Sequence, residues 1–327
     1  MLQHRRGRSR LRVVTALENE TIRMLVAGEP SGLELAPPGL VDWEDIDHFA
    51  HSFSTAHRFA DLRIADYVEL LADAGKLAEL SVDTIRHQHR VHAEDTSGNP
   101  AGSWSVFECL DGELRVGGET YLLVGGRFYK VAESYRKELD EFIDKMNEWS
   151  GVLPDSTTAE PEGAYNERAA NSSVEYLNMD KALVRVGHHT NAIEFCDIYT
   201  SDGDFVHVKR HLRSNMLSHL FAQGSVAGDL FLMSAEYRDK SLAVVREKEQ
   251  DRATRTGDPS YVGRFSTFDT GEIVPARFEV VYAIVAEWRG RPYREALPFF
   301  SKVNLRRRVN ELTRMGYRVS LKRVEAR

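Results

Sequence analysis

The chain has 327 residues, of which 42% are hydrophobic and 28% are charged, and its formal net charge is −7. This length allows two domains of ordinary size. No apolar run approaches the roughly 18–20 residues that cross a bilayer, and the basic N-terminus lacks the apolar stretch of a secretory signal. The two cysteines, Cys109 and Cys196, form no CxxC pair, so neither a disulfide framework nor a cysteine zinc site is expected. We expect a cytoplasmic protein that does not contact membranes.

Positive charge is concentrated at the two ends of the sequence. Residues 1–16 contain five arginines and no acid, and residues 301–327 contain nine Lys or Arg against Glu311 and Glu325. The rest of the chain is therefore strongly acidic. Phosphate binding depends on local clusters of charge, so the C-terminal segment allows a nucleic-acid surface. The alternative is a solvated helix face together with a loose N-terminus.

The first half of the chain predicts helices followed by an antiparallel meander. Residues 1–40 alternate short apolar runs with Gly and Pro and predict no long element. Apolar spacing near 3.6 residues predicts a helix over 64–77 and another over 132–149. Four short strand-like runs lie between them, separated by DG, GG and GG, which are hairpin signals. These runs are residues 104–110, 113–116, 120–124 and 127–131.

A linker is predicted at residues 154–164, PDSTTAEPEGA, which contain no large apolar side chain. It separates an N-terminal helical and meander region, residues 1–153, from a second domain at 165–327. Within that second domain, the apolar run 278–288 is expected to form a central strand of a sheet. We therefore predict an α+β protein whose second domain is a mixed-sheet α/β structure. The other elements expected in this domain are a helix over 165–174, a strand over 182–186, two helices separated at Gly224, a helix over 305–315 and a strand over 317–324.

The ionisable residues of the second domain gather in the stretch 191–224, which predicts a strand, a tight TSDGD turn, a second strand and a helix. Because side chains alternate along a strand, Asp197 and Glu194 are expected on opposite faces unless a bulge intervenes. On the next strand, His207 and Lys209 share a face. The hairpin can therefore bring Asp197, His207 and Lys209 together, although an edge strand with no chemistry would have the same pattern.

This hairpin resembles the metal-dependent nuclease superfamily known by its PD-(D/E)XK signature. There, an acid on one strand is followed by an acid-X-Lys triplet on the next, and the acids hold Mg²⁺. Asp197 matches the first acid and Lys209 the lysine, whereas His207 stands where the second acid is expected. The resemblance implies Mg²⁺ or Mn²⁺ as cofactor, with Asp197, Glu194 and the helical Glu167 as metal ligands. In that case His207 would be a ligand or a base, unless the site is inactive.

A second resemblance covers most of the chain from about residue 80 to the C-terminus. Several phrases are similar to a sporadically distributed bacterial family of uncharacterised function, whose scattered occurrence resembles that of mobile or phage-defence genes. The family brings no established chemistry. The matching phrases are TYLLVGGRFYKV (120–131), YNE (165–167), IEFCDIY (193–199), HVKRHLRSNMLSHLFAQG (207–224) and LPFFSKVNLRRRV (297–309).

Two functions follow as hypotheses. The first is a metal-dependent nuclease acting on DNA or RNA, in which Asp197, His207 and Lys209 are catalytic. The second is a non-catalytic module that binds nucleic acid or a partner protein and has a degenerate nuclease-like core, an interpretation that the histidine at 207 favours. The residues expected to contact phosphates are Arg210, Arg213, Arg306, Arg307 and Arg308.

Overall fold

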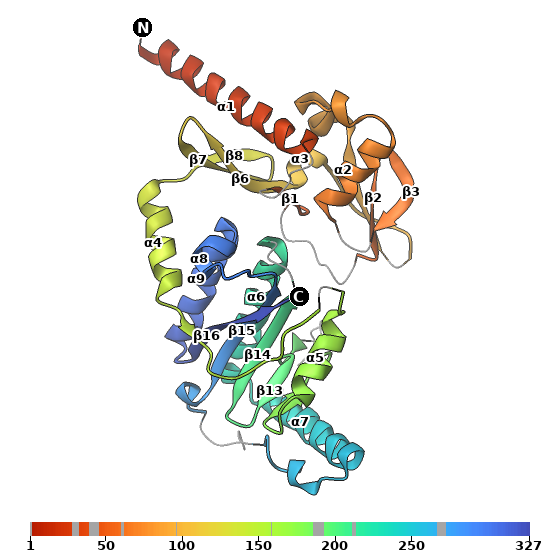
Figure 1. The fold of residues 1–327 in the computed structure, drawn as a ribbon, viewed down its shortest axis with the longest axis vertical. Coiled ribbons are helices and arrows are strands. Elements are labelled where there is room, and N and C mark those ends of the chain that lie inside the picture. Colours follow the sequence, from red (N-terminus) through yellow and green to blue (C-terminus); the bar gives the residue numbers. More distant parts are fainter. Residues whose placement is uncertain are drawn as a thin grey trace. The chain divides into compact units, whose positions relative to one another are not determined.

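The computed structural model shows an α+β protein, as predicted (Figure 1). It describes residues 2–27, 33–38, 46–59, 62–95, 97–157, 159–185, 193–210, 214–266 and 273–327. The chain divides into two compact units, Met1–Lys137 and Glu138–Arg327. Each unit is described by itself below, as unit 1 and unit 2.

Unit 1 contains two four-stranded antiparallel sheets, with strand orders β1-β6-β7-β8 and β3-β2-β4-β5. The strands are β1 (Leu33–Leu35), β2 (His48–His51), β3 (Ser54–Phe59), β4 (Arg90–Glu94), β5 (Pro100–Ser105), β6 (Leu110–Val116), β7 (Glu119–Val124) and β8 (Arg127–Lys130). The helices are α1 (Leu2–Val26), α2 (Ile64–Asp73), η2 (Leu77–Glu79), η3 (Thr84–Gln88) and α3 (Val106–Cys109).

The predicted meander is confirmed for β6, β7 and β8, which pair in sequence as antiparallel neighbours. The tight turn after β6 is made by Gly117 and Gly118 with φ of 61° and 80°, a conformation that glycine adopts at little cost. The predicted strand over 104–110 is wrong in its second half. There Ser105 and Glu108 form a capping box, which starts the short helix α3.

Helix α1 was not predicted from the sequence. Leu17, Thr21 and Leu25 are buried at intervals of four residues, the spacing of one helix face. They lie among many charged residues, so the apolar face is narrow and easy to miss. This face supports the helix where it packs against β6.

Unit 2 is built on a six-stranded mixed sheet with the order β10-β13-β14-β15-β16-β9. Strands β10, β13 and β14 are antiparallel neighbours, whereas β14, β15, β16 and β9 run parallel. As predicted, the apolar run forms a central strand, β15, and it is buried on both faces. The strands are β9 (Asn147–Glu148), β10 (Tyr176–Asn178), β13 (Ile198–Thr200), β14 (Asp204–Arg210), β15 (Glu279–Ala286) and β16 (Arg318–Glu325).

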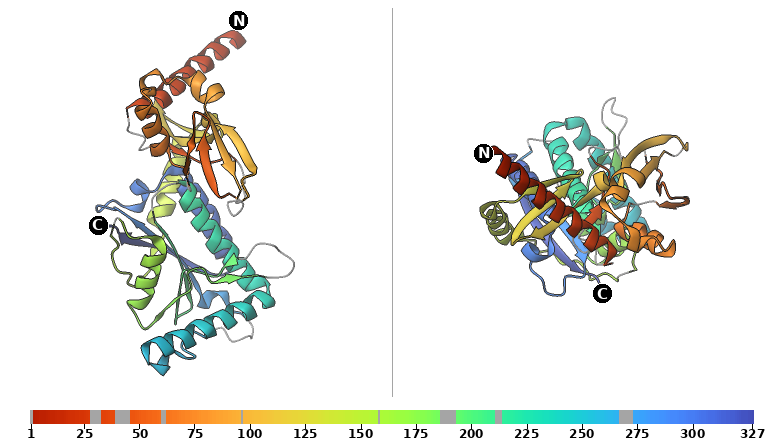
Figure 2. Two further views of the ribbon diagram at one scale, coloured as in Figure 1. Left: turned by 90° about the vertical axis from the view of Figure 1, so that its right-hand side faces the viewer. Right: turned by 90° about the horizontal axis from the view of Figure 1, so that it is seen from above.

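Helices cover both faces of this sheet, and Figure 2 shows α5 on one side and α6 on the other. Phe205 and Tyr282 belong to the core beneath α6 and α9, and Val206 and Val281 to the core beneath α5. The helices are α4 (Glu133–Asp144), which contains the unit boundary, α5 (Glu162–Asn171), α6 (Ser214–Met233), α7 (Ala235–Thr256), η4 (Pro259–Tyr261), η5 (Pro275–Arg277), α8 (Tyr293–Ala296) and α9 (Phe299–Arg314). The short strands β11 (Leu183–Val184) and β12 (Ile193–Glu194) form a separate two-stranded sheet.

The boundary between the units lies earlier in the chain than the predicted linker at 154–164. Phe142 and Met146 pack against the core beneath α6 and α9, and the indole Nε1 of Trp149 donates to Asp204 Oδ2 at 2.9 Å. These contacts attach the segment before the expected linker to unit 2. The expected linker itself already includes the first turn of α5.

Helix α6 continues through Gly224, where a break between two helices was predicted. A Cβ at this position would lie 2.7 Å from the Tyr282 ring and 3.1 Å from His207 Cδ2. The glycine therefore allows the helix to approach the sheet closely. A role in close packing, rather than helix termination, explains why this residue is small.

Candidate metal site

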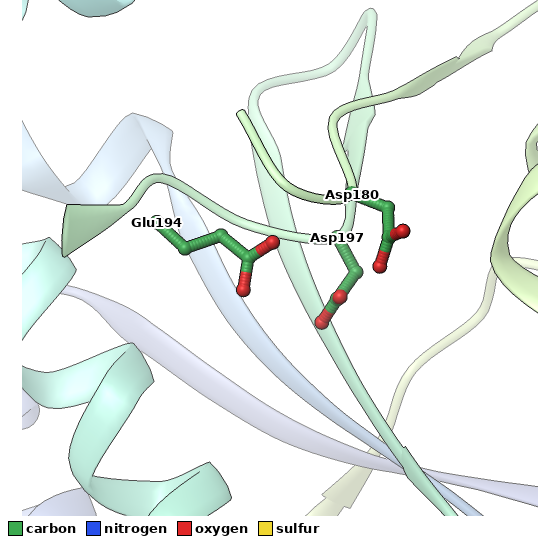
Figure 3. A group of neighbouring side chains, drawn as sticks. All are labelled: Asp180, Glu194 and Asp197. Carbon is green, nitrogen blue, oxygen red and sulfur yellow. The ribbon is translucent and has the colours of Figure 1, made fainter. Parts of the chain in front are cut away.

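Three carboxylates from unit 2 lie together: Asp180, Glu194 and Asp197 (Figure 3). One ligand oxygen of each lies within 4.8 Å of the other two. Asp180 is in the turn after β10, Glu194 ends β12, and Asp197 immediately precedes β13. The cluster could hold a metal ion, since carboxylate oxygens are the ligands that hard cations prefer.

The strand that carries Glu194 and Asp197 is interrupted, and this interruption brings both carboxylates into one site. Glu194 pairs within the two-stranded sheet, whereas Ile198 is the first residue of β13, which belongs to the six-stranded sheet. Between them, Phe195 and Cys196 are completely buried. Regular alternation would have placed the two acids on opposite faces, so this departure from a regular strand is a condition for the cluster.

Backbone and side-chain donors fix the position of Asp197. The Val208 N–H of β14 donates to Asp197 Oδ2 at 2.7 Å. On α5, Asn166 Nδ2 donates to Asp197 Oδ1 at 3.0 Å and to Asp180 Oδ1 at 2.9 Å. Asn166 is fully buried, and its Oδ1 has no hydrogen-bond partner in the described part of the chain. A single amide thus joins two of the three carboxylates.

Glu194 is held by the backbone of a strained turn. The Lys181 N–H donates to Glu194 Oε1 at 2.5 Å, and Lys181 has a φ of 59°. A non-glycine residue with positive φ is uncommon, and such conformations are concentrated at functional sites. The strained turn directly follows Asp180, so one segment supplies both a carboxylate and the donor that orients another.

The cluster brings three carboxyl groups together, of which Asp197 is buried and Asp180 and Glu194 are half-buried. Burial, followed by the charge of Glu194, raises the pKa of Asp197 well above its usual range. Burial is also the main cause that raises the pKa of Glu194, with the charge of Asp180 adding to it. A bound cation would favour the ionised carboxylates. The donor set and the charge both fit a metal ion.

Lys209 lies near the C-terminal end of β14, next to Val208, whose N–H donates to Asp197. Its Nζ donates to Glu162 Oε1 at 2.8 Å, and the other oxygen of Glu162 accepts from the Arg210 N–H at 3.1 Å. The charges of Glu162 and Lys209 both act on Glu194. Ligands of open α/β sheets bind outside the carboxyl ends of parallel strands, and the cluster and Lys209 occupy that position.

His207 does not join the carboxylate cluster. Its side chain is buried beside Tyr282, with ring centroids 6.3 Å apart, and Gly224 of α6 lies close to it. Burial lowers the pKa of His207 to about 4, so the ring is neutral at neutral pH. The structure therefore assigns His207 to the core beneath α6, and it gives this histidine no place among the possible metal ligands.

Glu167 also lies away from the cluster. Its side chain is exposed and pairs with Arg255 at 3.5 Å. A helix turns by about 100° per residue, so the neighbouring Asn166 faces the sheet while Glu167 faces solvent. The YNE phrase therefore does contribute to the site, but through its second residue.

Of the predicted phosphate-binding residues, Arg210 is buried inside unit 2. Its guanidinium donates to Ser156 Oγ at 2.6 Å and to the Thr157 carbonyl at 2.7 Å. It therefore attaches the segment before α5 to the end of β14 and is not available to a phosphate. Arg213 lies outside the described residues.

The arginines of α9 are partnered by acids. Arg307 and Arg308 contact the two oxygens of Glu311 at 3.0 and 2.9 Å. Arg306 lies 3.7 Å from Glu138. The side chain of Arg307 is 69% exposed, and exposed pairs of this kind are weak, so Arg307 is the one of the three that remains most accessible to a ligand.

Sequence reasoning missed Asp180, Asn166 and Glu162. Asp180 sits in a short turn between β10 and β11, where no motif marks an acid as a ligand. Glu162 lies in the segment predicted as linker. The signal for Asn166 was present in the predicted helix, because a polar residue between apolar Tyr165 and Ala169 on a buried face requires a polar partner.

The structure and the cluster define an α+β protein with a carboxylate site that could hold a metal ion. The chain belongs to a family of unknown function, DUF6119, whose model matches residues 8–325. No curated protein and no solved structure matches the chain. Among the described helices, none has both the length and the apolar character to cross a membrane.

Proposed function

We propose that the protein is a metal-dependent nuclease that hydrolyses phosphodiester bonds of DNA or RNA. The observation that carries this proposal is the position of Lys209 at the end of β14, next to the cluster of Asp180, Glu194 and Asp197. Phosphoryl chemistry requires cations near the reacting phosphate, and this site combines a fixed ammonium with three candidate metal ligands.

Mg²⁺ or Mn²⁺ is the cation class that fits. All three side chains of the cluster offer oxygen, and no histidine or cysteine of the described chain joins them, which favours hard cations over zinc or copper. A divalent cation would supply charge stabilisation at a phosphate oxygen and would lower the pKa of water. Asp197 is the most firmly fixed of the three ligands, because it accepts hydrogen bonds from both Val208 and Asn166.

Lys209 would stabilise negative charge that develops on the scissile phosphate. Its ammonium is held by Glu162, which fixes its direction and partly neutralises it. A phosphate that approaches the cluster can share this lysine with Glu162 or replace Glu162 as its partner. This role requires the lysine charge, so substitution should reduce turnover more than it weakens substrate binding.

A second candidate is a nucleic-acid-binding module without catalysis. It is favoured by the position of His207, which is buried and does not replace the second acid of the resembled motif. This module would bind through cationic residues such as Arg307, and its affinity would fall with salt because phosphate contacts release counterions.

The experiment is cleavage of labelled single- and double-stranded DNA and RNA with Mg²⁺, Mn²⁺ or EDTA. We expect cleavage that requires the cation and that falls roughly 100-fold or more in Asp197→Asn and Lys209→Ala. Lys240→Ala is the matched control, since Lys240 also pairs with a glutamate but lies on α7, with a half-exposed side chain. It should cleave as the parent does.

The other outcomes separate the two candidates. Salt-sensitive binding without cleavage would support the non-catalytic module and reject the nuclease. Cleavage that persists in both Asp197→Asn and Lys209→Ala would place the chemistry elsewhere in the chain. A protein that neither cuts nor binds nucleic acid would rule out both functions.

A further inference from the structure

Helix α5 forms one wall of the carboxylate cluster. Its first turn carries Glu162, which binds Lys209, and Gly163, where a Cβ would lie 3.3 Å from Asp180 Oδ2. One turn later, Asn166 donates to both Asp180 and Asp197. Glu162 pairs with Lys209, and its charge also raises the pKa of Glu194 and of Asp197.

The orientation of the Asn166 amide follows from its partners. Both acceptors are carboxylate oxygens, and only the NH₂ end of an amide can donate, so Nδ2 faces the cluster. The opposite end, Oδ1, is fully buried and has no hydrogen-bond partner in the described segments. Buried polar atoms are nearly always hydrogen-bonded, and an exception in a native structure points to a missing water, ion or functional constraint.

We propose that Asn166 is a positioning residue that ties Asp180 to Asp197 and thereby forms a cation site from two separate segments of the chain. Asp197 has an additional anchor in the Val208 N–H. The carboxylate of Asp180 comes from a turn, and Asn166 is what binds it to its neighbour.

The proposal explains why this position carries an amide and no carboxylate. Residues that orient metal ligands act through hydrogen bonds to those ligands. An aspartate at 166 would have nearly the same shape but would place a fourth carboxyl group at about 3 Å from two others. Such a site would need a proton or a cation to stay together, so the amide allows the cluster to form before a cation arrives.

The test uses the full chain and Mn²⁺ as the probe, with free Mn²⁺ measured by electron paramagnetic resonance. This inference assumes a cation site, as the proposed nuclease function does, but it does not require cleavage. Asn166→Ala is expected to weaken Mn²⁺ binding about 10- to 100-fold. Asn171→Ala is the matched control on the same helix, because Asn171 is exposed and contacts Arg255. It should bind as the parent does.

A second variant addresses the case in which Asn166→Ala does not fold. Asn166→Asp keeps the shape, and we expect Mn²⁺ to raise its melting temperature by several degrees more than it raises that of the parent. A simple packing role would leave this cation-dependent difference at zero.

Three results would overturn the inference. They are equal Mn²⁺ affinity of the parent and Asn166→Ala, equal stabilisation of the parent and Asn166→Asp by Mn²⁺, and a parent that binds no Mn²⁺. A parent that binds Mn²⁺ through Asn166 but cleaves no nucleic acid would support the positioning role and reject only the nuclease function.

Discussion

At the scale of single residues, unit 2 buries a histidine, His207, in apolar surroundings that keep its ring neutral. The pKa of this side chain is lowered by burial from 6.5 to about 4. In the unfolded chain the ring returns to its ordinary pKa, so between these two values the unfolded state binds more protons than the folded state. The free energy of unfolding therefore falls as the pH decreases from 6.5 to 4, and it is unaffected above this range.

We predict that this single group makes unit 2 less stable at pH 4 than at pH 7 by about 3 kcal/mol, since each pKa unit corresponds to about 1.4 kcal/mol. The loss is measured by denaturant titrations at pH 7 and pH 4, in which hydrogen exchange of peptides from β14 reports the unfolding of unit 2. His207→Leu should reduce the loss, whereas His87→Leu, a substitution in unit 1, should not. An identical pH dependence in the parent and His207→Leu would show that the buried ring does not control acid stability.

At the scale of elements, α6 lies close to the sheet because Gly224 has no side chain. We predict that Gly224→Ala destabilises unit 2 by about 1–3 kcal/mol, the usual cost of overpacking. The added Cβ would be too close to the Tyr282 ring, which packs beneath this position of α6. Thermal denaturation measures the effect. Val226→Ala, at a half-exposed position of the same helix, should be within about 0.5 kcal/mol of the parent. Equal stability of Gly224→Ala and the parent would show that the helix can move outward freely.

The elements themselves were predictable where the local pattern was strong. The GG turns of the meander and the continuous apolar run of β15 predicted strands correctly, because both signals lie within a few neighbouring residues. Gly224 misled the prediction because a glycine in a helix signals either an end or a close contact, and only the tertiary structure decides between them. Helix α1 was missed because its buried face is narrow and lies among many charged residues.

The site was predictable only in part. Asp197 directly precedes β13, which pairs with β14, and Lys209 lies on β14, so the hairpin that carries these two residues is local in sequence. Glu194 lies only three residues before Asp197. Asn166 and Asp180 come from other elements, and their approach depends on the packing of α5 and of a turn against the sheet. The prediction that Glu194 and Asp197 lie on opposite faces assumed a regular strand. The interruption at Phe195 and Cys196 removes this regular alternation.

At the scale of the whole molecule, the two units have separate cores, and the division lies within α4. We predict that a fragment of residues 133–327 folds and keeps the carboxylate site. A fragment of residues 154–327, cut at the boundary expected from composition, loses β9 and Trp149. Without them the edge of β16 is unpaired and Asp204 loses the indole donor.

Circular dichroism and thermal denaturation of the two fragments provide the measurement. The longer fragment should unfold cooperatively, and the shorter one should melt several degrees lower or remain unfolded. If both fragments have the same melting temperature, the segment 133–153 does not contribute to the stability of unit 2.

The interrupted strand before β13 also has an evolutionary consequence. The site depends on chain lengths as much as on residue types, because Glu194 and Asp197 converge only across a short irregular segment, and Asp197 meets Val208 only if the hairpin between them keeps its register. Phe195 can be exchanged for another apolar residue of similar size, but an insertion or a deletion on either side of Asp197 would separate the carboxylates. Within the family, we therefore expect loss of the site to begin with a change of length at this strand, before any acid is replaced.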